Sequence, residues 1–349
     1  MGKNLFIFNF KKLPLVFLVG VLLFFAIQLF IAQLKSFWEF CYSYSCLIED
    51  DNIRFEAQLR IIPDIIGSKK IFLTGSSQAR TDFDVEYLNN KLKNTNAIFY
   101  NLGVAGQAQP MEMFIVKNKL LRKKPEVIVY VSFVGSFYED CNYKRLRCYF
   151  YPAILPYMLK YVGMESVTGH KKDLIYAFLK ESSVFFRYRE SIRRILENYV
   201  HDFLYAEKKT WFKKYVQEKN ETEAYFINKI KEANKNKYKV TPYTKLNKAL
   251  FVLLAKNIVS KDVKFIVING PTHPLLKECY REEIDYAYNN FLADQAEKIG
   301  FVYLSESSLP KFTEKDFIDF LHLNASGKNK LSRFIEEYLL NSHYLSTNE

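Results

Sequence analysis

Two distant parts of this 349-residue chain carry side chains that together could perform nucleophilic acyl transfer. Ser76 and Ser77 follow Gly75 after the short apolar run KIFLT, and Asp319 and His322 stand three residues apart near the C-terminus. A serine becomes a nucleophile when a base lies within hydrogen-bond reach and a third group orients that base. We therefore predict a triad in which Ser77 attacks, His322 removes its proton and Asp319 holds the imidazole.

Each of these patterns also has a purely structural interpretation. Gly-Ser-Ser after a strand commonly forms a turn with a helix N-cap, and an Asp-x-x-His pair arises by chance in many chains. The catalytic interpretation is favoured because the patterns follow predicted strands, whose carboxyl ends gather ligands in open parallel sheets. A glycine turn at 103–106 adds the backbone N–H of Gly106, which together with the N–H of Ser77 could bind the oxyanion of an acyl-transfer intermediate.

Three more polar side chains lie near the predicted strand ends. Ser76, Ser136 and His273 are candidates for contacting a substrate. His273 stands beside a proline in the loop NGPTHP, where a structural role is the alternative.

The elements that must position these residues are predicted from short runs rich in Ile, Val, Phe and Tyr, closed by Gly, Ser, Asn or Pro. The predicted strands are 70–74, 97–101, 127–132, 264–269 and 301–304. Between and after these strands, apolar residues recur at helical spacing, which predicts helices at 84–93, 109–122, 244–260, 280–299 and 326–340. This alternation predicts an α/β fold with a parallel sheet covered by helices on both faces. Residues 134–243 interrupt it and predict a helical insertion between the third and fourth strands.

The order and spacing of the site motifs resemble the SGNH/GDSL hydrolase superfamily. The Gly-Asp-Ser block of that family is matched by GSS ending at Ser77, and its Asn-x-Gly-x-x-Gly block by NLGVAG ending at Gly106. Its final Asp-x-x-His block is matched by DFLH ending at His322. The resemblance covers about 68–133 and 262–341. It implies a flavodoxin-like fold, a serine nucleophile and no metal or other cofactor.

One block departs from the family pattern. The third block normally ends in Gly-x-Asn, whose side chain is an oxyanion donor, whereas VYVSFVGS at 129–136 contains no Asn. Ser132, Ser136 or the backbone of Gly135 could replace it. Losing one such donor costs about 10²–10³ in rate, so the sequence leaves open a slow or inactive enzyme.

A membrane anchor is predicted at residues 13–34, LPLVFLVGVLLFFAIQLFIAQL, which contain no charge. As a helix this stretch spans about 33 Å, enough for a hydrocarbon core of about 30 Å. Lys3, Lys11 and Lys12 precede it, and acidic residues outnumber basic ones at 35–54. The positive-inside rule therefore predicts a cytoplasmic N-terminus and an extracytoplasmic C-terminal domain. The predicted organisation is a cytoplasmic segment 1–12, the anchor 13–34, a juxtamembrane segment 35–67 and an SGNH-like domain 68–349.

A Gly-Ser-Ser motif behind one anchor is similar to the membrane-bound SGNH proteins of envelope acylation, such as the DltD-like and polysaccharide O-acetylation groups. This narrower resemblance implies a serine acyltransferase or esterase that acts on acyl esters of envelope glycans or lipid-linked substrates. It also implies a multipass membrane O-acyltransferase as partner. The alternative is a catalytically inactive adaptor, or glycan-binding partner, of such an acyltransferase.

The net charge and the cysteines add little to the predicted function. The net charge of +12 comes with no nucleic-acid-binding motif, so no nucleic-acid partner is expected. Cys41 lies near Cys46 and Cys141 near Cys148, which permits local disulfides outside the cytoplasm, with Cys279 left over. Neither couple has the spacing typical of a zinc site.

Overall fold

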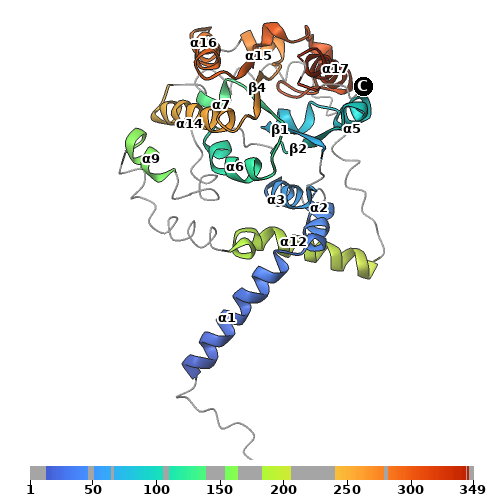
Figure 1. Ribbon diagram of the computed structural model, residues 1–349, viewed down its shortest axis with the longest axis vertical. Coiled ribbons are helices and arrows are strands. Elements are labelled where there is room, and N and C mark those ends of the chain that lie inside the picture. Colours follow the sequence, from blue (N-terminus) through green and yellow to red (C-terminus); the bar gives the residue numbers. More distant parts are fainter. Residues whose placement is uncertain are drawn as a thin grey trace, which may run out of the picture. The chain divides into compact units, whose positions relative to one another are not determined.

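The computed structural model describes residues 13–45, 51–63, 67–104, 110–138, 154–163, 183–205, 240–278, 282–342 and 344–345. The chain divides into two compact units (Figure 1). The first comprises residues 1–61 and 179–207, and the second comprises residues 62–178 and 208–349.

A parallel sheet of five strands forms the centre of the second unit, with the order β2-β1-β3-β4-β5. Its strands are β1 (Lys69–Gly75), β2 (Ala97–Asn101), β3 (Val127–Ser132), β4 (Lys264–Asn269) and β5 (Val302–Leu304). The register pairs Leu73 of β1 with Asn101 and Val129 on either side. The predicted α/β class with a parallel sheet is confirmed, and the arrangement is consistent with a flavodoxin-like fold.

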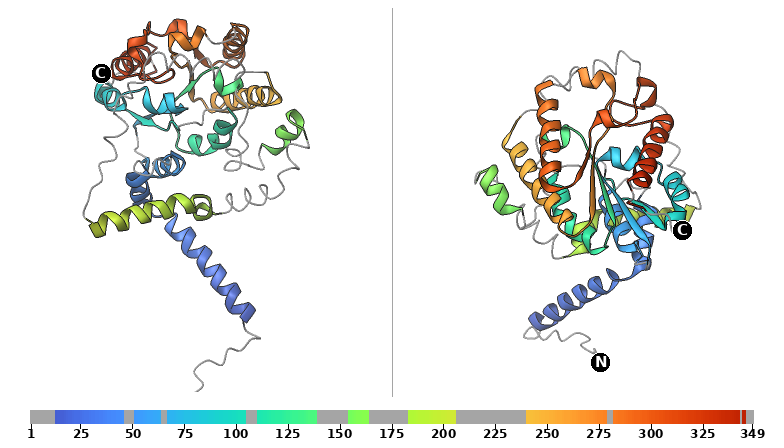
Figure 2. Two further views of the ribbon diagram at one scale, coloured as in Figure 1. Left: turned by 180° about the vertical axis from the view of Figure 1, so that it is seen from behind. Right: turned by 45° about the horizontal axis from the view of Figure 1, so that its top comes forward.

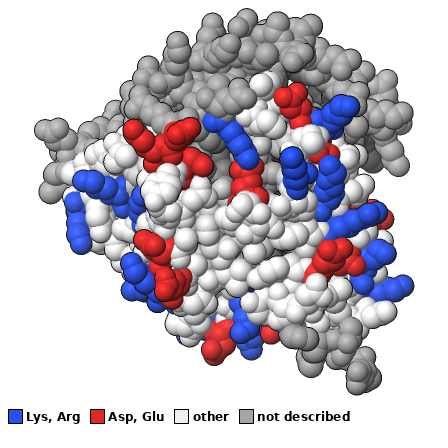
Figure 3. All heavy atoms as spheres, turned by 90° about the horizontal axis from the view of Figure 1, so that it is seen from above, with Lys and Arg blue, Asp and Glu red and all other residues white. Residues whose placement is uncertain are grey.

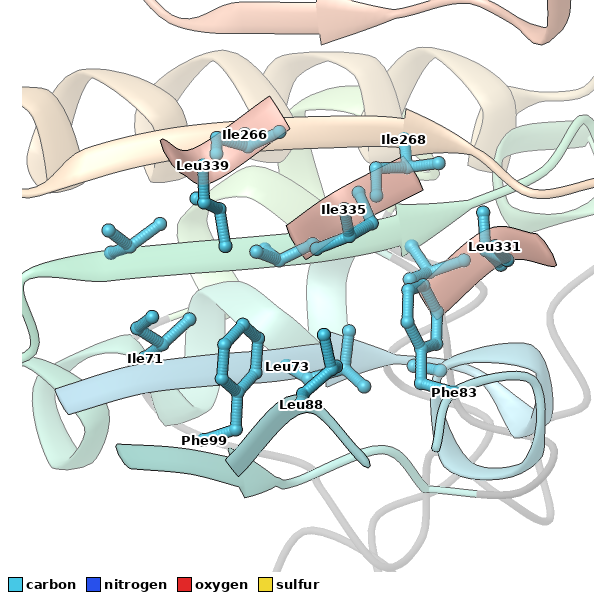
Figure 4. Packing of buried hydrophobic residues seen from close by; sticks show 14 of the residues in the cluster. Ile71, Leu73, Phe83, Leu88, Phe99, Ile266, Ile268, Leu331, Ile335 and Leu339 are labelled. Carbon is cyan, nitrogen blue, oxygen red and sulfur yellow. The ribbon is translucent and has the colours of Figure 1, made fainter. Parts of the chain in front are cut away.

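Helices α5 (Val85–Lys91) and α17 (Ala325–Asn341) cover one face of the sheet. Figure 4 shows Leu331, Ile335 and Leu339 of α17, spaced along one side of the helix, packed over the inward side chains of the strands. These three side chains are at most 1% exposed. The helical spacing in the sequence therefore marks the face that is buried.

The opposite face of the sheet carries the alternate side chains of the same strands. There Tyr130 of β3 stacks on Phe265 of β4, and both rings contact Phe251. Phe251 belongs to α14 (Pro242–Val259), which lies beside α6 (Pro110–Arg122) and α16 (Glu282–Ile299). Both faces of the sheet are thus covered, as strands that carry apolar side chains on both faces require.

The shorter helices of this unit lie in the connections. They are α4 (Ser77–Thr81), α7 (Gly135–Tyr138), α9 (Leu155–Tyr161) and α15 (Pro274–Glu278). Figure 3 views the molecule from above, and basic and acidic side chains are interspersed on the described part of that face.

The first unit contains α1 (Leu13–Ile31), α2 (Lys35–Ser45), α3 (Asp51–Ile61) and α12 (Val184–Tyr205). Its core is an apolar cluster that includes Trp38 and Cys41 of α2, Ile53 of α3 and Ile195 of α12. At the start of α12 the Ser183 hydroxyl donates a 2.8 Å hydrogen bond to Gln28 of α1.

The predicted insertion 134–243 is therefore divided in the structure. The sequence pattern predicts that all of it belongs to the α/β domain, whereas 179–207 clusters with the N-terminal helices (Figure 2). The physical reason is that the buried side chains of α12, such as Tyr188 and Ile195, complete the apolar cluster of α2 and α3. Cys41 is a buried free thiol in that cluster, and the other four cysteines lie outside the described residues.

The predicted anchor coincides largely with α1. Among the described residues no single helix is long and apolar enough to cross a membrane, but the helices Phe17–Ile31 and Lys35–Ser45, which meet at a bend of 75°, are together long and apolar enough to do so.

Candidate active site

Gly75 ends β1 and starts the turn that carries the two serines. Its φ is +129°, a conformation that residues with a Cβ rarely adopt. A Cβ on Gly75 would lie 2.2 Å from the carbonyl oxygen of Val131 in the neighbouring strand. Glycine is therefore required here, and it turns the chain sharply from β1 into α4.

The two serine hydroxyls have different partners. Ser76 is the N-cap of α4, is 4% exposed, and its Oγ accepts a hydrogen bond from the Gln78 N–H. Ser77 is the first residue of the helix and is half-buried. Its Oγ lies 2.7 Å from Nε2 of His322, 245 positions away in the sequence. The cap and the candidate nucleophile are thus neighbouring residues.

Asp319 and His322 lie in a tight loop before α17. The loop is closed by a bridge between Phe317 and Leu323 and by a hydrogen bond from the Ile318 N–H to the His322 carbonyl. Within it, Oδ1 of Asp319 accepts hydrogen bonds from the N–H groups of Leu321 and His322 at 2.8 and 2.9 Å. The loop backbone therefore holds the Asp319 carboxylate in place independently of its contact with the His322 imidazole.

The three predicted catalytic side chains come together. Asp319 Oδ2 lies 2.8 Å from Nδ1 of His322, and the other ring nitrogen faces Ser77. A carboxylate on Nδ1 favours the tautomer with the proton on that nitrogen, which leaves Nε2 as an acceptor for the serine proton. The arrangement is the one that a serine nucleophile, a general base and an orienting acid require.

The electrostatics agree with these roles. Burial raises the pKa of Asp319, but the hydrogen bond and charge of the His322 side chain, together with the backbone N–H groups of Leu321 and His322, outweigh burial and hold this pKa below its usual value. Burial lowers the pKa of His322, but the hydrogen bond and charge of Asp319 outweigh it and the net shift is upward. The charge of Asp82 adds to this upward shift, and the charge of Arg80 opposes it. The pair therefore favours an imidazolium next to a carboxylate.

Gln78 connects α4, the helix that begins at Ser77, to two loops. It is 1% exposed, and its Nε2 donates hydrogen bonds to the carbonyl oxygens of Pro271, at 2.8 Å, and Leu321, at 3.0 Å. Leu321 directly precedes the candidate base, so Gln78 holds His322 at a fixed distance from Ser77. Nothing in the sequence marks this residue as part of the site, because no spacing pattern distinguishes it from an ordinary helical glutamine.

The glycine loop after β2 also packs against α4. Asn101 donates a hydrogen bond from Nδ2 to the Arg80 carbonyl and accepts one at Oδ1 from the Gly103 N–H. A Cβ on Gly103 would lie 2.4 Å from the Arg80 nitrogen, so only glycine allows this approach. Gly106, the predicted oxyanion donor, lies outside the described residues. The N–H of Ser77, the other predicted donor, is in the first turn of α4.

Two side chains considered for the missing Asn are buried in the structure. Ser132 is 0% exposed and accepts a hydrogen bond from the Tyr288 hydroxyl. Ser136 is 2% exposed, and its hydroxyl accepts a hydrogen bond from the Phe133 N–H at the start of α7. Both hydroxyls thus have partners within the protein.

His273 is buried beside the loop that carries Asp319 and His322. Its Nδ1 accepts a hydrogen bond from the Leu275 N–H, its backbone N–H donates to Phe320, and its ring packs edge-on against Phe317. Burial lowers its pKa. The geometry favours the structural alternative, in which His273 supports the loop that carries Asp319.

Asp82 is the other polar residue at the site that the sequence analysis did not identify. It is the C-cap of α4, is 0% exposed and contacts the segment that carries His322. No cluster of metal-ligating side chains occurs in the part of the chain that the structure describes.

Comparison with known proteins adds no assignment to this geometry. No protein-family model matches the chain, and no curated protein sequence matches it.

Proposed function

We propose that the protein is a serine-dependent acyltransferase or esterase. The observation that carries the proposal is the continuous hydrogen-bonded chain from Ser77 Oγ through His322 to Asp319, with distances of 2.7 and 2.8 Å. In the proposed reaction the Ser77 oxygen attacks an acyl carbonyl while His322 Nε2 takes the hydroxyl proton. The imidazolium then protonates the leaving alkoxide, and the acyl group remains on Ser77 as an ester.

The second half of the reaction releases the acyl group. A water molecule or a sugar hydroxyl gives its proton to His322 and attacks the ester of Ser77, so that the serine hydroxyl is restored. Asp319 keeps the imidazole oriented in both halves. The choice between water and sugar decides whether the product is a free acid or a new ester.

We further propose an envelope glycan as substrate and an N-terminal membrane anchor. The anchor is supported by α1, whose large apolar side chains are exposed, among them Phe17 at 72% and Leu22 at 59%. A polar pocket of about 130 Å³ lies near the ends of β4 and β5 and is lined by carboxylate, amide, hydroxyl and ammonium groups, and none of its described lining residues belongs to the triad. Asn269, Thr272, Asp285 and Glu306 are among its lining residues.

The test is turnover of simple acyl esters by the full chain in detergent, with and without an oligosaccharide acceptor. We expect release of the acid in water and acylated sugar when acceptor is present, and loss of both in Ser77→Ala. Equal turnover by wild type and Ser77→Ala would contradict the proposal.

The buried and already bonded hydroxyls of Ser132 and Ser136 favour a second candidate, an inactive adaptor for a membrane O-acyltransferase. An adaptor should still restore envelope acylation to a deletion strain when Ser77 and His322 are both replaced by Ala. An enzyme should not.

A further inference from the structure

Asp82 is a buried acid at the C-terminal end of the helix that begins with Ser77. Its Oδ1 accepts hydrogen bonds from the Thr81 hydroxyl, at 2.8 Å, and from the Leu323 N–H, at 3.1 Å. Leu323 is the residue after His322 and lies 241 positions from Asp82 in the sequence. One carboxyl oxygen thus joins the end of α4 to the segment that carries the base.

The other oxygen of this carboxyl makes no such contact. Within the described part of the chain, Oδ2 of Asp82 is buried and accepts no hydrogen bond. A buried carboxylate oxygen without a donor is costly, and the carbonyl groups at a helix C-terminus disfavour a negative charge further. Leu323 needs only one acceptor oxygen, which an amide would supply as well. Hydrogen bonding alone therefore does not explain why an acid is present.

The charged neighbours supply a reason. The charge of His322 lowers the pKa of Asp82, and the charge of Asp319 raises it. In turn, the charges of Asp319 and Asp82 raise the pKa of His322, and the charge of Arg80 lowers it. An imidazolium at His322 is the cation that develops during the proposed reaction. Asp82 and Asp319 both favour it, whereas Arg80 opposes it.

We propose that Asp82 is a positioning residue for the base: it holds the His322 segment against α4 and its negative charge favours the imidazolium form of His322. This inference rests on the proposed function, in which His322 accepts the Ser77 proton. The triad would then use two carboxylates, one that orients the ring at Nδ1 and one that acts from the far end of the nucleophile helix.

The ionisation of Asp82 supports the proposal. Burial raises the pKa of Asp82 from 3.8 to about 7, so this carboxyl changes charge near neutral pH. The folded protein binds the Asp82 proton more tightly than the unfolded chain does. Protonation of Asp82 therefore stabilises the fold, and this contribution is complete below about pH 4 and is lost as the pH rises through about 7. A charged Asp82 above pH 7 thus reduces stability while it favours the imidazolium.

The test compares Asp82→Asn, which keeps the acceptor oxygen and removes the charge, with Asp82→Ala, which removes both. Asp84→Asn is the matched control, since Asp84 is the N-cap of α5 and Asn is an equally good cap. The measurement is the NMR titration of His322 in the full chain in detergent micelles with labelled histidine. The chain has five histidines, and His322→Gln assigns the signal.

We expect the His322 midpoint to fall by about one pH unit in Asp82→Asn and to stay unchanged in Asp84→Asn. The melting temperature of Asp82→Asn at pH 8 should equal or exceed that of wild type, while Asp82→Ala should melt lower. An unmoved His322 midpoint in Asp82→Asn would overturn the proposal, as would equal melting losses in both Asp82 variants. If the His322 midpoint shifts in Asp82→Asn but Ser77 does not react with acyl esters, the proposed function is contradicted and the role of Asp82 is not.

Discussion

At Ser77 the hydroxyl oxygen lies 2.7 Å from His322, whereas the hydroxyl of Ser76 accepts a hydrogen bond from the backbone of its own helix. Both interpretations of the Gly-Ser-Ser motif are therefore supported, each for a different serine. The sequence predicted the meeting of Ser77, His322 and Asp319 because parallel strands bring their carboxyl ends to one edge. It could not predict Gln78 or Asp82, since nothing in the spacing shows that a polar helix residue becomes buried.

Individual residues, His322 and Asp319, set the pH dependence of the proposed reaction. Only neutral His322 can accept the serine proton, and Asp319 raises the pKa of His322 above 6.5. The rate of Ser77 acylation should therefore rise with pH through a midpoint above 6.5. Asp319→Asn should lower both that midpoint and the plateau rate, the latter by about 10³–10⁴. Stopped-flow acylation across pH 5–9 measures both quantities, and an unchanged profile in Asp319→Asn would exclude its role as the orienting acid.

Among the elements, the turn from β1 into α4 has the strictest requirement. Gly75→Ala must adopt positive φ and place its Cβ 2.2 Å from a backbone oxygen of β3. We expect a loss of at least about 3 kcal/mol in the free energy of unfolding.

The matched control for this turn is Gly300→Ala. Gly300 also has a positive φ, of +87°, but in the described part of the chain no atom beyond its own neighbours lies within 4 Å of where a Cβ would stand. The loss should therefore be about 1–2 kcal/mol. Urea unfolding of the full chain in detergent measures both losses. Similar losses for the two variants would show that the contact with β3 is unimportant.

The elements also show where sequence patterns suffice. Three predicted strands, 97–101, 127–132 and 264–269, match the observed bounds; 70–74 is one residue short at each end, and 301–304 begins one residue early. Alternation with helices and closure by Gly, Ser or Asn were enough for this. The division of the insertion was not predicted, because the apolar stripe of α12 shows that a face is buried but not which helices bury it.

At the scale of the whole molecule, the proposed anchor in α1 should hold the protein in a membrane. Leu18 and Leu22 lie near the middle of α1 and are 54% and 59% exposed. Replacing both with Lys should cost about 5–7 kcal/mol of insertion free energy and release the chain from sedimented membranes. Replacing both with Ala should leave it bound. Immunoblots of washed membrane and supernatant fractions measure this, and membrane retention of the Lys variant would argue against an anchor in α1.

The central claim is that Ser77 is a nucleophile activated by His322. The most direct measurement is mass spectrometry of the folded full chain after reaction with a fluorophosphonate probe, beside Ser77→Ala, His322→Ala and the control Ser260→Ala. We predict one phosphonyl adduct, on Ser77, in wild type and Ser260→Ala, and no adduct in the other two variants. A folded wild-type protein without that adduct, or equal labelling of Ser77→Ala, would contradict the account.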